Sequence, residues 1–109
     1  GKQTRDFTYV REVVRALIQA GTLSGIGGHV CNVAEGESID LVQLVTTINR
    51  ILGTHIEPKF APPAPGDVRD SLAEVSHARR VLDYVPEITF EEALCLTIDW
   101  YRQDAKANG

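Results

Sequence analysis

The side chains that most often perform catalysis or hold metals are sparse in this sequence. The three histidines, His29, His55 and His77, lie more than twenty residues apart, and no set of Cys and His has the spacing of a zinc site. Cys31 and Cys95 each lie in an apolar run, which predicts buried, reduced thiols rather than a disulfide. No Gly-x-Ser-x-Gly turn presents a serine nucleophile. We therefore expect no metal site and find no positive sign of hydrolysis.

Glycine-rich and charged segments offer other sites, and each has a plain structural explanation. The stretch from Gly25 to Val30 breaks the Gly-x-Gly-x-x-Gly pattern of dinucleotide sites and precedes a strand-like segment rather than a helix. The acidic pairs Glu91-Glu92 and Glu35/Glu37 lie at or just before predicted helix starts, where carboxylates stabilise the helix end. Near the prolines, Arg69 lies beside two aspartates and can form a surface ion pair.

Four helices are predicted to position these residues. The first covers about residues 11–20 and ends at Gly21, and the second starts after an N-cap at Ser38 and ends at Gly53. A short third helix covers about 75–83, and a fourth follows the capping box formed by Thr89 and Glu92 and runs to about residue 103. The buried face predicted for the fourth helix consists of Phe90, Ala93, Leu94, Thr97, Trp100 and Tyr101.

Short strands are predicted at residues 5–10, 30–34 and 56–60, where β-branched and aromatic residues or apolar alternation occur. Three prolines make residues 61–70 an extended loop, and residues 104–109 are expected to fray. The predicted fold class is α/β: a small mixed sheet of three or four short strands with about four helices, the second and fourth helices packing on the sheet.

Length and charge limit the function classes. With 109 residues, 12.0 kDa and 43% hydrophobic residues, the chain is expected to form a single domain, residues 1–109. The net charge of −4 disfavours nucleic acid and anionic membranes as partners. No apolar stretch has the length of a membrane span, which predicts a soluble, cytoplasmic protein. The sequence starts with Gly and has no Met, as expected for a processed or trimmed piece of a longer protein.

Four motifs follow one another along nearly the whole chain. They are Arg5-Asp6-Phe7-Thr8-Tyr9-Val10, Asn32-Val33-Ala34-Glu35-Gly36-Glu37-Ser38, Pro65-Gly66-Asp67-Val68-Arg69-Asp70-Ser71-Leu72-Ala73, and the segment from Phe90 through Arg102. In this order and spacing they resemble the carboxy-terminal, substrate-binding part of nucleotide-sugar epimerases and dehydratases. These enzymes are extended short-chain dehydrogenases/reductases, and the resemblance is closest to UDP-sugar 4-epimerases.

The resemblance implies a set of substrate-binding residues. The family arginine that contacts the nucleotide diphosphate corresponds to Arg5, and the aspartate that contacts the ribose hydroxyls corresponds to Asp67. A guanidinium suits this role because its fork can bind two phosphate oxygens. The second family arginine corresponds to Ala64 here, so Arg69 is the candidate substitute from the same loop. Without this family assignment, Arg5 can equally be an ion-pair partner and Gly66-Asp67 a plain turn.

The resemblance also shows what is missing from the sequence. Family members hold NAD(P) on an amino-terminal Rossmann half and catalyse with a Tyr-x-x-x-Lys pair. Here Tyr9, Tyr84 and Tyr101 have no lysine four residues later, and the Rossmann half is lacking. We therefore expect no cofactor in this chain, NAD in a complete parent enzyme, and no complete catalysis by the chain alone.

Two functions remain open at this point. The chain is either the sugar-nucleotide-binding portion of an epimerase or dehydratase, binding its ligand weakly at best, or a non-enzymatic domain that keeps the scaffold and self-associates. A homodimer is predicted through the apolar edge at residues 30–34, or a domain-swapped oligomer through the glycine hinge at residues 21–28.

Overall fold

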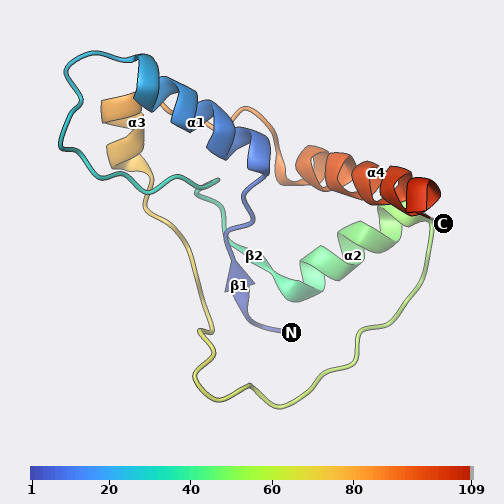
Figure 1. Cartoon of the computed structure of the whole chain (residues 1–109). Coiled ribbons are helices and arrows are strands. Elements are labelled where there is room, and N and C mark those ends of the chain that lie inside the picture. Colours follow the sequence, from blue (N-terminus) through green and yellow to red (C-terminus); the bar gives the residue numbers. More distant parts are fainter. Residues whose placement is uncertain (109) are drawn as a thin grey trace.

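The computed structural model describes residues 1–108, which extend over 50 × 37 × 22 Å. The elements follow the order β1 (Thr4–Arg5), α1 (Val10–Thr22), β2 (Ile39–Asp40), α2 (Leu41–Leu52), α3 (Ser76–Leu82) and α4 (Phe90–Asn108). Between α2 and α3 the chain makes a wide excursion without helices or named strands (Figure 1). The predicted α/β class with four helices is confirmed.

The sheet is smaller than predicted. Strands β1 and β2 pair antiparallel, with Thr4 opposite Asp40 and Arg5 opposite Ile39. A single parallel bridge joins Thr4 to Asp70 on the other side of β1. In the described residues the sheet thus has two strands and one bridge, where the sequence predicts three or four strands.

Two of the predicted strands are wrong for identifiable reasons. Residues 30–34 form no strand; the side chains of Cys31 and Val33 pack on the small core instead. At residues 56–60, the backbone of Ile56 bonds to the side chain of Asn49, which donates to its carbonyl at 2.8 Å and accepts from its N–H at 3.2 Å. An apolar or alternating run predicts an extended backbone, and whether another strand pairs with it is decided by the tertiary structure.

The helix ends agree with the prediction at some positions and differ at others. Gly53 adopts φ 70° and ends α2 as predicted, since this left-handed conformation suits glycine. The N-cap of α2 is Asp40, not Ser38; its carboxylate accepts from the N–H of Gln43 at 2.6 Å. Helix α1 continues past Gly21 to Thr22. The start of α2 lies two residues later than predicted because residues 39 and 40 form β2.

Helix α4 begins as predicted and ends later. The hydroxyl of Thr89 accepts from the N–H of Glu92 at 3.2 Å and donates to its carboxylate at 3.0 Å, which is the predicted capping box. The helix extends to Asn108, whose side chain donates to the Asp104 carbonyl at 3.0 Å. The prediction that residues 104–108 fray is wrong, and residue 109 lies outside the described residues.

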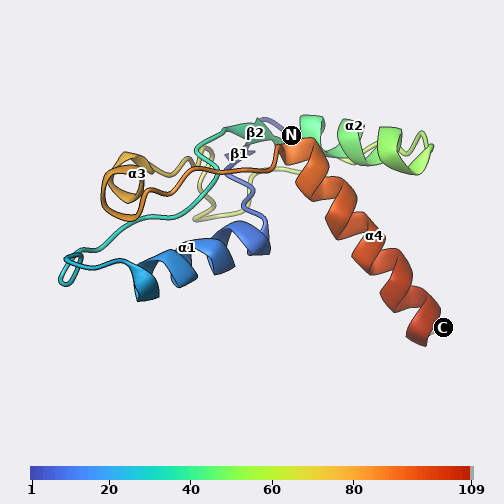
Figure 2. The same ribbon diagram turned by 90° about the horizontal axis from the view of Figure 1, so that it is seen from above.

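The buried core is small and lies between α1 and α3. It consists of Ala16, Ala78, Leu82 and Tyr84, with Ile26, Cys31, Val33 and Val81 packed against it. Helix α2 contacts β2, which directly precedes it in the chain, whereas α4 packs on α2 and diverges from it toward its carboxyl end (Figure 2). Trp100 and Tyr101, predicted to be buried, are instead 58% and 63% exposed.

The structure also shows how the cysteines and two of the histidines lie. Cys31 and Cys95 are half-buried free cysteines, in agreement with the predicted absence of a disulfide. The rings of His29 and His77 lie with their centroids 5.4 Å apart. Among the helices of residues 1–108, none combines the length and apolar character that crossing a membrane requires.

Candidate functional site

Three predicted site residues come together where the amino-terminal strand meets the proline-rich loop. Arg5 Nη2 lies 3.0 Å from Asp67 Oδ1, and Gln3 Nε2 donates to Asp67 Oδ2 at 3.1 Å. Both carboxylate oxygens of Asp67 are therefore occupied by side chains of the first five residues. The Arg5 and Asp67 side chains remain 31% and 35% exposed, so both can be reached from solvent.

Backbone hydrogen bonds fix this arrangement. The N–H of Thr4 donates to the carbonyl of Arg69 at 2.8 Å, and the N–H of Ser71 donates to the carbonyl of Thr4 at 3.1 Å. A turn around Gly66, at φ 78°, directs the chain back, with the N–H of Asp67 donating to the Ala64 carbonyl at 3.1 Å. The loop carrying Asp67 and Arg69 is thus aligned along β1.

Both the backbone and the side chain of Arg69 belong to the same site. Its carbonyl also accepts from Arg5 Nη1 at 3.3 Å. Its side chain lines a cavity of about 650 Å³ together with Lys2 and Asp67. The predicted residues Arg5, Asp67 and Arg69 therefore form one cluster, although sixty-two residues separate the first two in sequence. The position of the missing family arginine, Ala64, supplies no charge to this cluster.

Asp6 is a positioning residue that the sequence analysis did not single out. Its carboxylate accepts from the N–H groups of Glu35 at 3.0 Å, Gly36 at 2.9 Å and Ala73 at 3.4 Å. One side chain thereby joins the loop before β2 and the loop after Asp67 to the end of β1. The signal that could have revealed it is its place directly after Arg5, the residue predicted to bind the diphosphate, since aspartate readily bonds backbone N–H groups in loops.

A partly buried ion pair joins two residues of α1. Glu12, 1% exposed, pairs with Arg15 at 2.6 Å and accepts from the N–H of Glu87 at 3.2 Å. Arg15 also donates to the Val85 carbonyl, and its guanidinium carbon lies 5.5 Å from the centre of the Tyr84 ring. These contacts attach the segment between α3 and α4 to α1.

Glu35 is a partly buried acid that lies near Glu12. Burial raises the pKa of Glu35 to about 7, and the nearby negative charges of Glu12, Asp6 and Glu37 act in the same direction. Near neutral pH this carboxyl therefore changes its charge within the folded protein.

This raised pKa predicts a pH dependence of stability. Since Glu35 ionises near pH 4.5 when unfolded but only near 7 when folded, the free energy of unfolding should fall as pH rises from about 4.5 to about 7. Glu35→Gln should flatten that part of the profile, as measured by urea unfolding followed through Trp100 fluorescence. Glu57→Gln, at an exposed position, is the control; equal slopes for wild type and Glu35→Gln would contradict the assignment.

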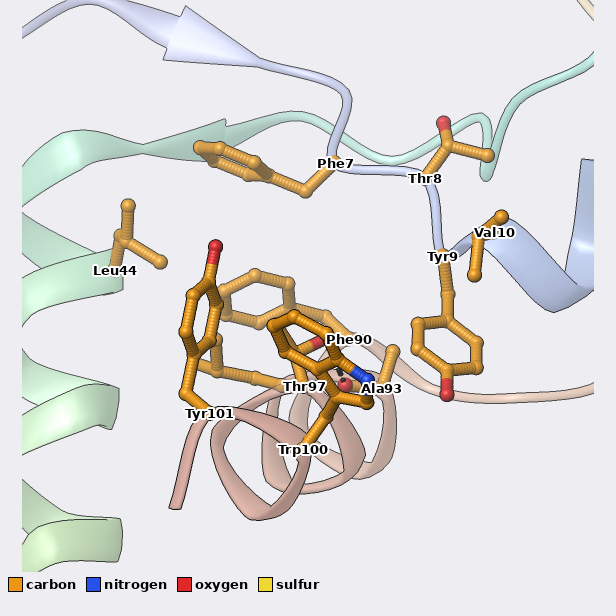
Figure 3. A pocket seen from close by; sticks show the side chains of 11 residues that line it. Phe7, Thr8, Tyr9, Val10, Leu44, Phe90, Ala93, Thr97, Trp100 and Tyr101 are labelled. Carbon is orange, nitrogen blue, oxygen red and sulfur yellow. Dashed lines mark hydrogen bonds between the residues drawn. The ribbon is translucent and has the colours of Figure 1, made fainter. Parts of the chain in front are cut away.

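An aromatic pocket of about 460 Å³ lies between the segment that follows β1 and the face of α4 (Figure 3). Phe7 and Phe90 are in contact with ring centroids 5.8 Å apart, and Trp100 and Tyr101 meet edge to face at 5.1 Å. Tyr9 closes the other side of the pocket. Since its lining is apolar and carries no charged side chain, this pocket is separate in character from the Arg5 and Asp67 cluster.

Comparison with known proteins supports the resemblance inferred from the four motifs. The homologues and structural neighbours of this chain include UDP-sugar 4-epimerases of the NAD-dependent short-chain dehydrogenase/reductase family, which confirms that resemblance. No protein-family model matches the chain. The UDP-glucose 4-epimerase of Mycolicibacterium smegmatis is 35% identical over 106 residues, which are 97% of this chain and 34% of that protein.

Other relatives agree in both sequence and structure. The UDP-glucuronate 4-epimerase of Thermodesulfobacterium geofontis is 30% identical over 95% of this chain and 32% of its own length. The crystal structure of Thermotoga maritima UDP-glucose 4-epimerase with UDP-glucose superimposes with a TM-score of 0.88 and 34% identity, covering 96% of this chain and 33% of that one. The chain thus spans about a third of the length of the relatives it matches.

Proposed function

We propose that this chain is the sugar-nucleotide-binding portion of an NAD-dependent nucleotide-sugar epimerase or dehydratase. Arg5 would bind the diphosphate, Asp67 the ribose hydroxyls, and Arg69 would contribute the second positive charge. The observation that carries the proposal is the contact between Arg5 and Asp67, which brings two of the four motifs together; Asp67 and Arg69 also line a cavity. The T. maritima relative was solved with UDP-glucose, and a UDP-glucuronic acid 4-epimerase from Bacillus cereus with UDP-glucuronic acid and NAD.

The site is chemically suited to exchange its present contacts for those of a ligand. A partly exposed ion pair such as Arg5 with Asp67 contributes only about 0–1 kcal/mol. A diphosphate offers the guanidinium a bidentate partner of higher charge, and ribose hydroxyls can donate to the released carboxylate. The contact between Arg5 and Asp67 therefore holds both side chains at the site without blocking it.

The residues described here do not fit a dinucleotide cofactor. The glycine-rich stretch at residues 25–28 follows α1 and is followed by residues 29–34, which form neither a helix nor a strand, whereas a dinucleotide site needs a glycine turn between a strand and the start of a helix. We therefore assign no cofactor step to this chain. In a complete enzyme, NAD would be held by the other two thirds.

Titration with UDP-glucose or UDP tests the proposal. We expect dissociation constants in the millimolar range or lower, and a loss of about tenfold or more in Arg5→Ala, because charge-assisted hydrogen bonds to phosphate are lost. Arg79→Ala removes the same charge from an exposed position on α3 and should leave the affinity unchanged. Failure of the wild-type chain to bind, or equal losses in both variants, would refute the proposal.

Self-association is a second candidate function, and exposed apolar side chains favour it. On α1, Leu17 is 68% and Ile18 60% exposed, and α4 exposes Trp100 and Tyr101. Exposed apolar surface of this extent is typical of interfaces. The absence of a strand at residues 30–34 removes the predicted edge, so the helical faces are the better interface candidate. Domain swapping through residues 21–28, where Gly25 and Gly28 adopt positive φ, remains a form of this proposal.

Light scattering tests whether the chain self-associates. A self-associating chain should show a mass above 12.0 kDa, and Leu17→Lys should shift it toward the monomer because a charge would enter the interface. Val30→Lys, at a position 89% exposed outside the helices, should change the mass less. A monomer at high micromolar concentration would eliminate self-association as the function.

A further inference from the structure

The loop of residues 34–38, which precedes β2, is anchored by two side chains from other parts of the chain. The hydroxyl of Tyr84 donates to the Ala34 carbonyl at 2.8 Å, and burial raises the pKa of Tyr84 to about 12, so this hydroxyl stays protonated near neutral pH. The N–H groups of Glu35 and Gly36 donate to the two carboxylate oxygens of Asp6 at 3.0 and 2.9 Å. A force on the Glu35 side chain therefore acts directly on the contact with Asp6.

Asp6 also connects this loop to the nucleotide site proposed above. Its Oδ2, which accepts from Gly36, accepts from the N–H of Ala73 at 3.4 Å as well. Ala73 follows the loop that carries Asp67, and Arg5 directly precedes Asp6 in the chain. Through one carboxylate, a change in the loop before β2 can thus reach both residues that are proposed to bind the nucleotide.

The side chain of Glu35 lies among groups that carry negative charge. Its partial burial raises its pKa most, and the charges of Glu12 on α1, Asp6 after β1 and Glu37 in the same loop raise it further. Glu12 is 1% exposed and is already paired with Arg15 at 2.6 Å. Ionisation of Glu35 therefore places a further negative charge beside carboxylates that the fold keeps in place.

Other charged groups line a polar cavity of about 520 Å³ together with Glu35. They are Arg50 on α2, Glu91 on α4 and Glu87 in the segment before α4. Arg50 is bound to Glu91, and Arg15 lies 3.7 Å from Glu87. These positive charges are paired with other carboxylates, so negative charge prevails around Glu35.

We propose, building on the function proposed above, that Glu35 makes the nucleotide site sensitive to pH near neutrality. While its carboxyl is neutral, the loop before β2 stays on Asp6. When the carboxyl ionises, repulsion from Asp6 loosens that contact, and the loop that carries Asp67, which Asp6 joins through Ala73, is held less firmly. The backbone hydrogen bonds of Thr4 remain, so the affinity for the nucleotide falls by a limited factor and is not lost.

Titration with UDP-glucose on either side of neutrality tests this regulation. Its diphosphate is esterified at both ends and keeps its charge, whereas the terminal phosphate of UDP ionises a second time at about pH 6. We expect binding about fivefold weaker at about pH 8 than at about pH 6, the low end of typical coupling between sites. Glu35→Gln should retain the tighter binding at both pH values. Glu57→Gln, at an exposed position, is the control and should keep the wild-type pH dependence.

A second measurement detects the switch without a ligand. The NMR signals of the Gly36 and Ala73 amides, which both donate to Asp6, should shift together with a midpoint at about pH 7, and Glu35→Gln should remove this transition. UDP-glucose should move the midpoint to higher pH, because a ligand that prefers the neutral form of Glu35 must favour that form in return.

The outcomes separate this inference from the function on which it rests. If UDP-glucose binds equally at both pH values, or if Glu35→Gln keeps the pH dependence, the nucleotide function stands and regulation by Glu35 is wrong. If the Gly36 and Ala73 amides show no shared transition, the coupling through Asp6 is overturned. If UDP-glucose binds at neither pH, the proposed function itself fails and the regulation fails with it.

Discussion

Tyr84→Ala should lower the free energy of unfolding by about 3–5 kcal/mol, the range for deleting a large buried aromatic side chain. Tyr84 is 1% exposed and is the largest member of the core between α1 and α3. Its hydroxyl donates to the Ala34 carbonyl at 2.8 Å, and its ring lies under Arg15. Because a chain of this size is stabilised by only about 5–15 kcal/mol, this variant should lose a large share of the stability of the fold.

The contribution of the ring can be separated from that of the hydroxyl. Tyr84→Phe keeps the packing and leaves the Ala34 carbonyl unpaired, which should cost about 1–2 kcal/mol. Urea unfolding monitored by circular dichroism measures both variants. A Tyr84→Ala protein as stable as Tyr84→Phe would show that the core described here does not determine stability.

Asp6→Ala should destabilise the protein by about 2–3 kcal/mol and weaken UDP binding as well. Removal of the carboxylate leaves the N–H groups of Glu35, Gly36 and Ala73 without their acceptor. It also removes one of the contacts that hold the loop after Asp67 to the strand that carries Arg5, while the backbone hydrogen bonds of Thr4 remain. The two residues proposed to bind the nucleotide would then be held less firmly in register, although neither is altered.

Two companion variants make this test specific. Asp6→Asn keeps one acceptor oxygen and should recover part of the stability, whereas Asp70→Ala removes an exposed aspartate that accepts only from the Thr4 hydroxyl at 3.0 Å. Thermal unfolding and UDP titration should be measured on the same samples. Normal UDP affinity in a folded Asp6→Ala protein would contradict the positioning role.

The sequence predicted the local structure of this chain better than the pairing of its strands. Capping residues and glycine act within a few residues, and for this reason Gly53 and the Thr89 capping box were found at their predicted positions. The strand at residues 30–34 was predicted wrongly because an apolar run has the same composition whether it pairs with a neighbour or packs its side chains on a core. The burial of Trp100 was likewise inferred from spacing on α4, although burial depends on what covers the helix.

The sequence could identify residues of the candidate site but not how they are arranged in space. Arg5, Asp67 and Arg69 were selected by motif, yet the cavity and the contact of Asp67 with Gln3 depend on how the proline-rich loop returns to β1. Asp6 was missed because its three partners lie 29, 30 and 67 residues away. Single-sequence reasoning detects spacings within one helix or strand and does not reach such distances.

The hydrogen bonds that join Thr4 to Arg69 and Ser71 close a loop of more than sixty residues. The formation of these bonds should therefore be a late step in folding. Helices α1 and α2 can form from local contacts, whereas this closure must await a long-range encounter that costs chain entropy. A ligand that touches both Arg5 and Asp67 would act as a reversible crosslink across the loop. Ligand binding would then raise the free energy of unfolding, by about 2.7 kcal/mol at a ligand concentration one hundred times the dissociation constant.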